Sequence, residues 1–301
     1  MALETGAATD AADLLSKLRD FINAQTDWVI DEYDSGADEL HIHESGGVGY
    51  WALKAVADMD AVDGSLPFEQ PGIVAFSATG YDAGSAYDAQ PNTTNNARGL
   101  GCFPDTSVPA YWFFTDGSTY VHAVVRAHST SYSHLQIGML TQFGTWTGGA
   151  YLAGVVVDEN GSLRESAWLD ENNADGDLRA DIDGEVDFFL SSASNLGSLV
   201  QPDFSGRNSS GDFGQVFDQV NEWNSRAIFM PIYVKGQRQD GSNSWSYLGY
   251  PPDVRLVNAR YISDESTVTI GSDEWIVLPY YYRNDGFDTA DFIAFAYRKV
   301  T

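Results

Sequence analysis

Seven consecutive residues in the middle of the chain carry the oxygen atoms that a calcium loop needs. Glu171, Asn173, Asp175 and Asp177 alternate along Glu-Asn-Asn-Ala-Asp-Gly-Asp, with a glycine before the last of them. Calcium loops place oxygen ligands at alternate positions and use a glycine where the chain turns sharply. The match departs from the pattern at Ile182, where a bidentate Glu belongs. The segment is a calcium candidate, and the alternative is a solvated acidic loop that collects cations loosely.

Two histidines, His41 and His43, alternate along one expected strand, so both rings point to the same face. In an oligomer with a symmetry axis nearby, such a pair could bind a transition metal, because imidazole suits these ions. The pattern favours the alternative, which is a pair of polar residues on a solvent-facing side of the strand.

No residues form a recognisable catalytic set. Cys102 is the only cysteine, so no disulfide can form within the chain, and we expect a small buried thiol rather than a nucleophile. The chain has no G-x-S-x-G motif, and with 43 acidic residues close carboxylate pairs arise by chance. The sequence therefore predicts a protein that is not an enzyme, and a halophilic hydrolase ranks last among the alternatives.

The charge balance indicates the medium in which the chain works. It carries 43 Asp and Glu against 16 Lys and Arg, a formal net charge of −27. Molar salt shortens the Debye length to about 3 Å and screens this repulsion, so the composition favours a salt-adapted protein over an ordinary acidic one. The charge argues against a nucleic-acid partner, and no apolar stretch approaches the roughly 18 residues of a membrane span.

The elements that position these residues are mostly strands. Ala11–Ala24 is the exception, because Leu14 and Leu18 recur at helical spacing and Asp10 stands where an N-cap belongs. Asp116-Gly117 predicts a hairpin turn between strands at 108–114 and 120–127. Alternating or aromatic runs predict further strands at 39–44, 50–57, 73–79, 135–140, 151–157, 186–190, 227–234, 245–248, 254–262, 267–270, 275–282 and 292–297.

These elements predict a mainly β fold with an N-terminal amphipathic helix, an antiparallel β-sandwich-like domain and a second β-rich region. We expect the helix and a lead-in segment over 1–30 and the sandwich-like domain over 31–157. An acidic insertion or linker rich in Gly, Asn and Ser should follow over 158–221, and the second β-rich region over 222–301.

Two stretches share a pattern of turns and aromatic strands. Val74 to Val157 contains VAFSATGYDAGSAYDAQPN, TSVPAYWFFTDGSTYVHAVVRAHSTSYSHLQIGML and YLAGVVV, and Gly249 to Pro279 reads GYPPDVRLVNARYISDESTVTIGSDEWIVLP. Together they resemble tail-associated virion structural proteins of long-tailed double-stranded DNA viruses. The resemblance carries no catalytic signature. It implies a tail or baseplate protein located in the virion, and the acidic composition would then imply a halophilic host.

The resemblance also implies partners. These are other tail proteins and further copies of this chain, arranged with ring symmetry. No cofactor is implied, and calcium at 171–177 would be the single exception. The alternative function is a receptor- or glycan-binding module at the tail tip.

The aromatic runs Tyr111–Phe114 and Tyr280–Tyr282 have two interpretations. They could form a sugar-binding platform, or they could belong to the core and to a subunit interface, which strands that are aromatic on both faces favour. We expect Trp112 and Trp275 to lie in a subunit contact, and the competing expectation is that both are core residues. The apolar stripe around Leu18 should dock the helix on the β-domain or on a neighbouring subunit.

Overall fold

The protein is mainly β. The computed structural model describes residues 2–62, 70–93, 97–102, 107–127, 130–157, 163–166, 176–181, 186–190, 200–203, 229–237, 245–259, 261–280 and 293–299. Within these residues the chain forms antiparallel sheets, a short 3-10 turn at Tyr87–Ala89 and one α-helix, α1 (Ala11–Asn23). The expected fold class is therefore confirmed. In the part of the chain that is described, no helix is long and apolar enough to cross a membrane.

The central sheet has eight strands. Its order is β1 (Ala2–Ala8), β7 (Val108–Thr115), β8 (Tyr120–Arg126), β9 (Tyr132–Met139), β11 (Thr147–Val157), β13 (Gly176–Asp181) and β14 (Val186–Leu190), with β12 (Leu163–Ser166) also paired to β11. Strands β7 to β9 are buried on both faces almost throughout, which explains why their sequences are apolar and aromatic at consecutive positions.

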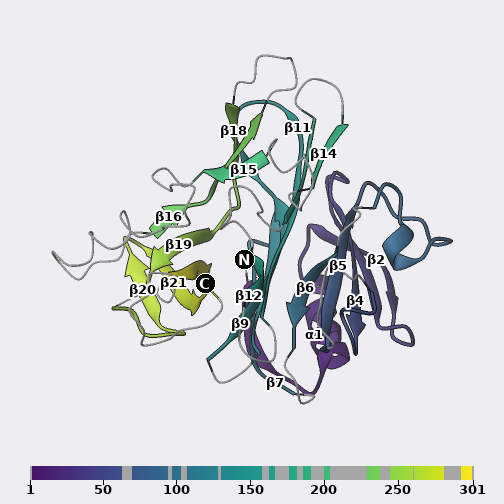
Figure 1. Cartoon of the computed structure of the whole chain (residues 1–301), viewed down its shortest axis with the longest axis horizontal. Coiled ribbons are helices and arrows are strands. Elements are labelled where there is room, and N and C mark those ends of the chain that lie inside the picture. Colours follow the sequence, from purple (N-terminus) through teal and green to yellow (C-terminus); the bar gives the residue numbers. More distant parts are fainter. Residues whose placement is uncertain are drawn as a thin grey trace.

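Two five-stranded sheets cover the two faces of the central sheet (Figure 1). The N-terminal sheet has the order β2 (Trp28–Asp34), β3 (Glu39–Glu44), β4 (Tyr50–Val56), β5 (Gly72–Ala78) and β6 (Arg98–Gly101). The C-terminal sheet has the order β16 (Phe229–Pro231), β19 (Val254–Asn258), β22 (Ile293–Lys299), β21 (Asp273–Pro279) and β20 (Thr267–Ile270). The result is a three-layered β structure.

Side-chain alternation along β7 divides the core between the two outer layers. Tyr111 and Phe113 pack with α1 and the N-terminal sheet, whereas Trp112 and Phe114 pack with the C-terminal sheet. Successive side chains of a strand point to opposite faces, so one aromatic strand serves two cores. The described strands of the region expected over 222–301 therefore pack against the C-terminal-sheet side of the central sheet without adding a strand to it.

A small four-stranded sheet lies at the top of Figure 1. Its order is β10 (Thr141–Gln142), β18 (Trp245–Tyr250), β17 (Tyr233–Gln237) and β15 (Val200–Asp203). The 158–221 segment, expected as an acidic insertion or linker, supplies β15 here and adds β12, β13 and β14 to the central sheet.

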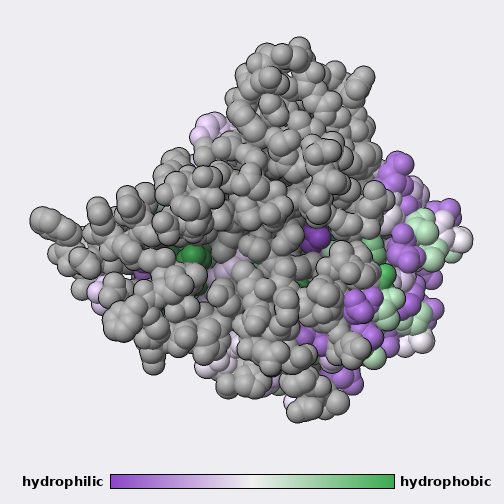
Figure 2. Space-filling model, in the orientation of Figure 1, coloured by the Kyte–Doolittle hydropathy of each residue, from purple (hydrophilic) through white to green (hydrophobic). Residues whose placement is uncertain are grey.

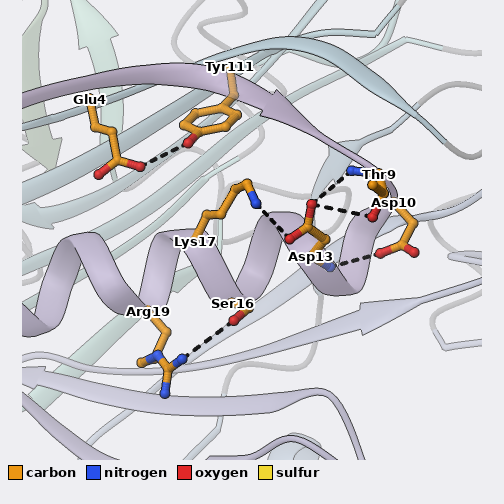
Figure 3. Close-up of polar contacts among 8 residues, drawn as sticks. All are labelled: Glu4, Thr9, Asp10, Asp13, Ser16, Lys17, Arg19 and Tyr111. Carbon is orange, nitrogen blue, oxygen red and sulfur yellow. Dashed lines mark hydrogen bonds and ion pairs between the residues drawn. The ribbon is translucent and has the colours of Figure 1, made fainter.

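Helix α1 begins where its cap predicts. Asp10 Oδ1 accepts a hydrogen bond of 2.8 Å from the backbone N–H of Asp13, and Asp13 Oδ2 accepts one of 2.8 Å from the N–H of Thr9 (Figure 3). Lys17 Nζ lies 2.7 Å from Asp13 Oδ1, and this bond lowers the pKa of the Asp13 carboxyl. The N–H of Asp13 in the first turn, and that of Thr9 just before the helix, are thereby satisfied.

Strand β1 is an element that local sequence does not predict. Its residues, ALETGAA, have low strand propensity, yet they pair antiparallel with β7. The Tyr111 hydroxyl donates a hydrogen bond of 2.8 Å to Glu4 Oε1 (Figure 3), and a Cβ atom at Gly6 would lie 2.7 Å from Tyr111 Oη. The glycine therefore allows the tyrosine ring to lie flat across β1.

The expected hairpin between β7 and β8 is confirmed. Gly117 adopts a positive φ of 92°, and Asp116 Oδ1 accepts hydrogen bonds from the backbone N–H groups of Ser118 (2.8 Å) and Thr119 (2.6 Å). Asp and Gly thus each contribute a distinct property to the turn, a side-chain acceptor and a left-handed backbone.

Candidate functional site

The calcium hypothesis stays a prediction. Glu171, Asn173 and Asp175 lie outside the described residues, and Asp177 lies in β13, opposite Leu152 of β11 and Leu190 of β14. Elsewhere in the described ranges, no group of three or more His, Cys, Asp or Glu side chains is arranged to hold a metal ion.

The three predicted interface residues are buried within the single chain. Leu18 lies in the core between α1 and the sheets, Trp112 lies between the central and C-terminal sheets, and Trp275 packs on Phe229 in the C-terminal sheet. This is where the core alternative places both tryptophans, whereas a subunit contact at either of them stays a prediction. Cys102 is also buried, and burial raises the pKa of its thiol to about 12, as expected for a structural thiol.

Exposed aromatic side chains gather on the small four-stranded sheet. Phe143, which follows β10, is 42% exposed, Tyr233 of β17 is 38% exposed, and Tyr247 of β18 is 52% exposed. Tyr250, also in β18, is half-buried beside them. We call Phe143, Tyr233, Tyr247 and Tyr250 the aromatic surface.

The rings of the aromatic surface touch one another. The Tyr233 ring centroid lies 6.1 Å from that of Tyr247 and 6.3 Å from that of Tyr250, both in edge-to-face geometry. The Phe143 centroid lies 5.9 Å from Tyr233 and 5.7 Å from Tyr250. Edge-to-face contacts of this kind add to the stability of an aromatic cluster, so the four rings hold one arrangement.

The strands below the aromatic surface hold it rigidly. The backbone N–H of Phe143 donates to the Leu248 carbonyl at 2.8 Å, and the Trp146 indole N–H donates to the same carbonyl at 3.1 Å. A Cβ atom at Gly249, which has a φ of 159°, would clash with the carbonyl oxygen of Thr141. Only glycine allows β10 and β18 to approach this closely.

A half-buried cation borders the aromatic surface. The Arg255 guanidinium lies 5.5 Å from the Tyr250 ring centroid and 5.4 Å from that of Trp275. Its Nη1 donates to the Val254 carbonyl at 2.7 Å. Cation–π contacts of this length attach the aromatic surface to the C-terminal sheet.

His134 is buried between the central and C-terminal sheets with its hydrogen bonds complete. Its Nε2 lies 2.9 Å from the Pro279 carbonyl, and a carbonyl can only accept, so Nε2 carries the hydrogen. Its Nδ1 therefore accepts from the Tyr297 hydroxyl at 2.8 Å, and that hydroxyl accepts from Gln136 Nε2 at 2.7 Å. This chain of bonds is complete with a neutral imidazole, the form that burial favours by lowering the pKa of His134.

His122 is buried beside the same tyrosine. Its Nε2 lies 2.8 Å from Tyr151 Oη and its ring centroid 5.5 Å from that of Tyr297, whereas its Nδ1 has no hydrogen-bond partner among the described residues. Burial lowers the pKa of both His122 and His134 to about 3. These histidines lie on consecutive strands, and the register of β8 with β9 brings their side chains to the same face.

The His41 and His43 pair does not lie on a solvent-facing side, which corrects the favoured expectation. His41 is 4% exposed, and His43 is half-buried with its Nδ1 2.8 Å from Asp31 Oδ2. Loop residues that follow β5 cover His41, and Tyr81 of this loop lies 5.1 Å from it between ring centroids. A loop that folds back over a sheet is not predictable from strand alternation.

No protein-family model and no curated protein matches the chain. The aromatic surface is a set of partly exposed rings on the small four-stranded sheet.

Proposed function

We propose that this chain is a structural subunit of a viral tail and assembles with neighbouring tail proteins through the aromatic surface. The observation that supports this most is a contiguous set of four aromatic residues, three of them 38% to 52% exposed. Exposed apolar patches of this kind mark interaction sites, because a partner that covers them removes apolar area from water. Tyr and Arg are also enriched at the energetic centres of interfaces.

The resemblance of the 74–157 and 249–279 stretches to tail proteins supports the same function. Tail components form closed rings, in which one patch of a subunit meets a different patch on the next copy. A chain with a net charge of −27 repels its own copies unless the contact is substantial or salt screens the charge. The aromatic surface can supply such a contact without adding charge.

Truncation of the exposed tyrosines is expected to weaken assembly. Tyr247→Ala and Tyr233→Ala should each cost about 2 kcal/mol, or roughly 30-fold in the association constant, because each removes a ring from the contact. Tyr261→Ala is the matched control, since Tyr261 is 54% exposed but lies outside the aromatic surface. Sedimentation velocity in molar KCl measures the mass, and circular dichroism checks that each variant is folded.

Two outcomes would count against assembly. If the Tyr247→Ala and Tyr233→Ala variants are folded and assemble like the parent, the aromatic surface is not the assembly contact. A parent that stays monomeric but binds a polysaccharide, and loses this binding in both variants, would instead assign the receptor- or glycan-binding function to the same surface.

Salt should control both folding and assembly. Lowering KCl from about 1 M to about 0.1 M lengthens the Debye length from about 3 Å to about 10 Å, so the 43 carboxylates repel one another again. We expect a lower melting temperature and dissociation of the assembly. Sucrose at equal osmolality should not restore either property, because it does not screen charge. A melting temperature that stays constant between these two KCl concentrations would contradict the salt-adapted interpretation.

A further inference from the structure

Strand β20 forms an open edge of the C-terminal sheet. Within the described residues it pairs with β21 on one side and with no strand on the other. Figure 1 shows β20 at the left of the view, away from the small sheet that carries the aromatic surface. Its sequence, Thr-Val-Thr-Ile, has high strand propensity and contains neither a charged residue nor proline. Such a strand presents a row of unpaired backbone groups to another chain.

The hydrogen bonds between β20 and β21 show which residues face the open edge. The backbone N–H of Val277 donates to the Ser266 carbonyl at 3.0 Å, directly before β20 begins. Bonded and non-bonded pairs alternate along an antiparallel ladder, so the next residue of this strand that bonds to β21 is Val268. Thr267 and Thr269 therefore direct their backbone N–H and C=O groups outward, where no described strand pairs with them.

The other edge strands of the described sheets are protected against such pairing. Natural β proteins place charged residues or proline on exposed edges, or keep these strands very short. Strand β10 has only two residues. The remaining edges carry Glu4 in β1, Asp31 in β2, Arg98 in β6, Glu165 in β12, Asp187 in β14, Pro202 in β15 and Pro231 in β16. Figure 2 shows hydrophilic residues at the right of the view, where the N-terminal sheet and its edge strand β2 lie. Among these strands β20 is the exception.

The charge around β20 is locally balanced. Three carboxylates that flank the strand each form an ion pair with a basic side chain. The pairs are Asp273–Arg298 at 2.8 Å, Glu274–Lys299 at 3.0 Å and Glu265–Arg126 at 2.7 Å. The whole chain has only 16 Lys and Arg for 43 acidic residues, so this edge is less negative than the chain as a whole. A second copy of the chain can therefore approach here with less repulsion than elsewhere.

We propose that β20 pairs antiparallel with β20 of a second copy of this chain. A patch that meets its own copy forms an isologous contact around a two-fold axis. With this axis beside Val268, Thr267 of each copy lies opposite Thr269 of the other, and the outward backbone groups of both threonines form hydrogen bonds. The contact goes beyond assembly through the aromatic surface, because it lies on a different sheet.

Disulfide trapping tests this register. Directly opposite residues of an antiparallel pair have Cβ atoms about 4.5–5.5 Å apart, closest in non-bonded pairs, and a disulfide needs about 3.5–4.5 Å. Val268→Cys should therefore cross-link two chains when diamide is added in molar KCl. Ile270→Cys is the matched control: Ile270 is 45% exposed and lies on the same strand face, but two residues from the axis. It should cross-link at least tenfold more slowly in non-reducing electrophoresis. Cys102 is buried and does not compete.

Two further substitutions in the Val268→Cys chain separate backbone pairing from the aromatic surface. Thr269→Pro removes an outward N–H that β21 does not use, so the chain should fold, as circular dichroism checks, and the cross-linking rate should fall at least tenfold. Tyr247→Ala should leave the rate unchanged, because Tyr247 lies on the small four-stranded sheet.

Each other outcome contradicts a specific part of the proposal. No cross-link in Val268→Cys would exclude pairing of β20 between two copies. Equal rates for Val268→Cys and Ile270→Cys would indicate random collision and overturn the register, and these two variants decide the question even if Thr269→Pro does not fold. A cross-link that persists in a folded Thr269→Pro chain would contradict backbone pairing. Loss of the cross-link in Tyr247→Ala would contradict a contact that is separate from the aromatic surface.

Discussion

Lowering the pH from 7 to 4.5 is expected to remove about 5 kcal/mol from the free energy of unfolding. His122 and His134 cause this loss, because both are buried between the central and C-terminal sheets in the neutral form. Protonation of His134 would place an N–H against the Tyr297 hydroxyl, whose oxygen already accepts from Gln136. Protonation of His122 would bury a charge together with a donor that has no partner.

The direction of this change in the free energy of unfolding follows from the number of protons bound by the folded and unfolded states. The ordinary histidine pKa is 6.5, and burial lowers the pKa of His122 and His134 to about 3 in the folded chain. The unfolded state therefore binds more protons between these values. Stability is complete above pH 6.5 and falls as the pH drops toward 3, by about 1.4 kcal/mol per pH unit for each histidine.

Denaturant unfolding in molar KCl at several pH values between 7 and 4.5 measures this loss. The slope should approach two protons per molecule, and His41, whose pKa burial also lowers, adds a slope of the same sign. His134→Gln should reduce the slope by about one proton, since glutamine does not titrate. A stability that is constant from pH 7 to 4.5 would contradict the buried neutral pair.

Leu18→Asp is expected to abolish folding. Leu18 is fully buried in the core that α1 shares with the N-terminal and central sheets. Removing a buried leucine side chain costs about 2–5 kcal/mol, and burying a carboxylate without a partner adds several more. The sum approaches or exceeds the roughly 5–15 kcal/mol that stabilises a typical domain. Circular dichroism and a thermal melt should therefore show no cooperative transition.

Two variants of the same helix separate burial from charge. Asn23→Asp adds the same carboxylate at an exposed position and should cost less than about 1 kcal/mol. Leu18→Met keeps the volume and should cost less than about 1.5 kcal/mol. If the Leu18→Asp variant folds like the parent but fails to assemble, the core assignment of Leu18 is wrong. The apolar stripe would then belong to a subunit contact.

Features that depend on residues close together in the chain were predictable from the sequence. The Asp10 and Asp13 cap, the helical spacing of Leu14 and Leu18, and the Asp116-Gly117 turn each follow from groups within a few residues of one another. Strand positions were predictable for the same reason, and 39–44, 186–190 and 267–270 coincide with β3, β14 and β20. Local hydrogen bonds and alternation are enough to specify such elements.

Two features show what local sequence patterns do not specify. The residues of β1 have little strand propensity, and the segment is a strand because it pairs with the free edge of β7. Its own residues therefore do not predict the strand. The aromatic type of Trp112 and Trp275 suits both a core and an interface, and only the packing of three layers shows that both are buried within the chain. Composition does not distinguish a covered strand face from an exposed one.

The candidate sites were decided by tertiary structure alone. The aromatic surface combines Phe143 with Tyr233, Tyr247 and Tyr250, and Tyr81 of the loop that follows β5 covers His41 of β3. Each site joins residues separated by tens to about a hundred positions, which sheet pairing and loop packing bring within a few ångströms. Because strand register and layer order are properties of the whole chain, the sequence determined the elements, and their packing determined which side chains meet.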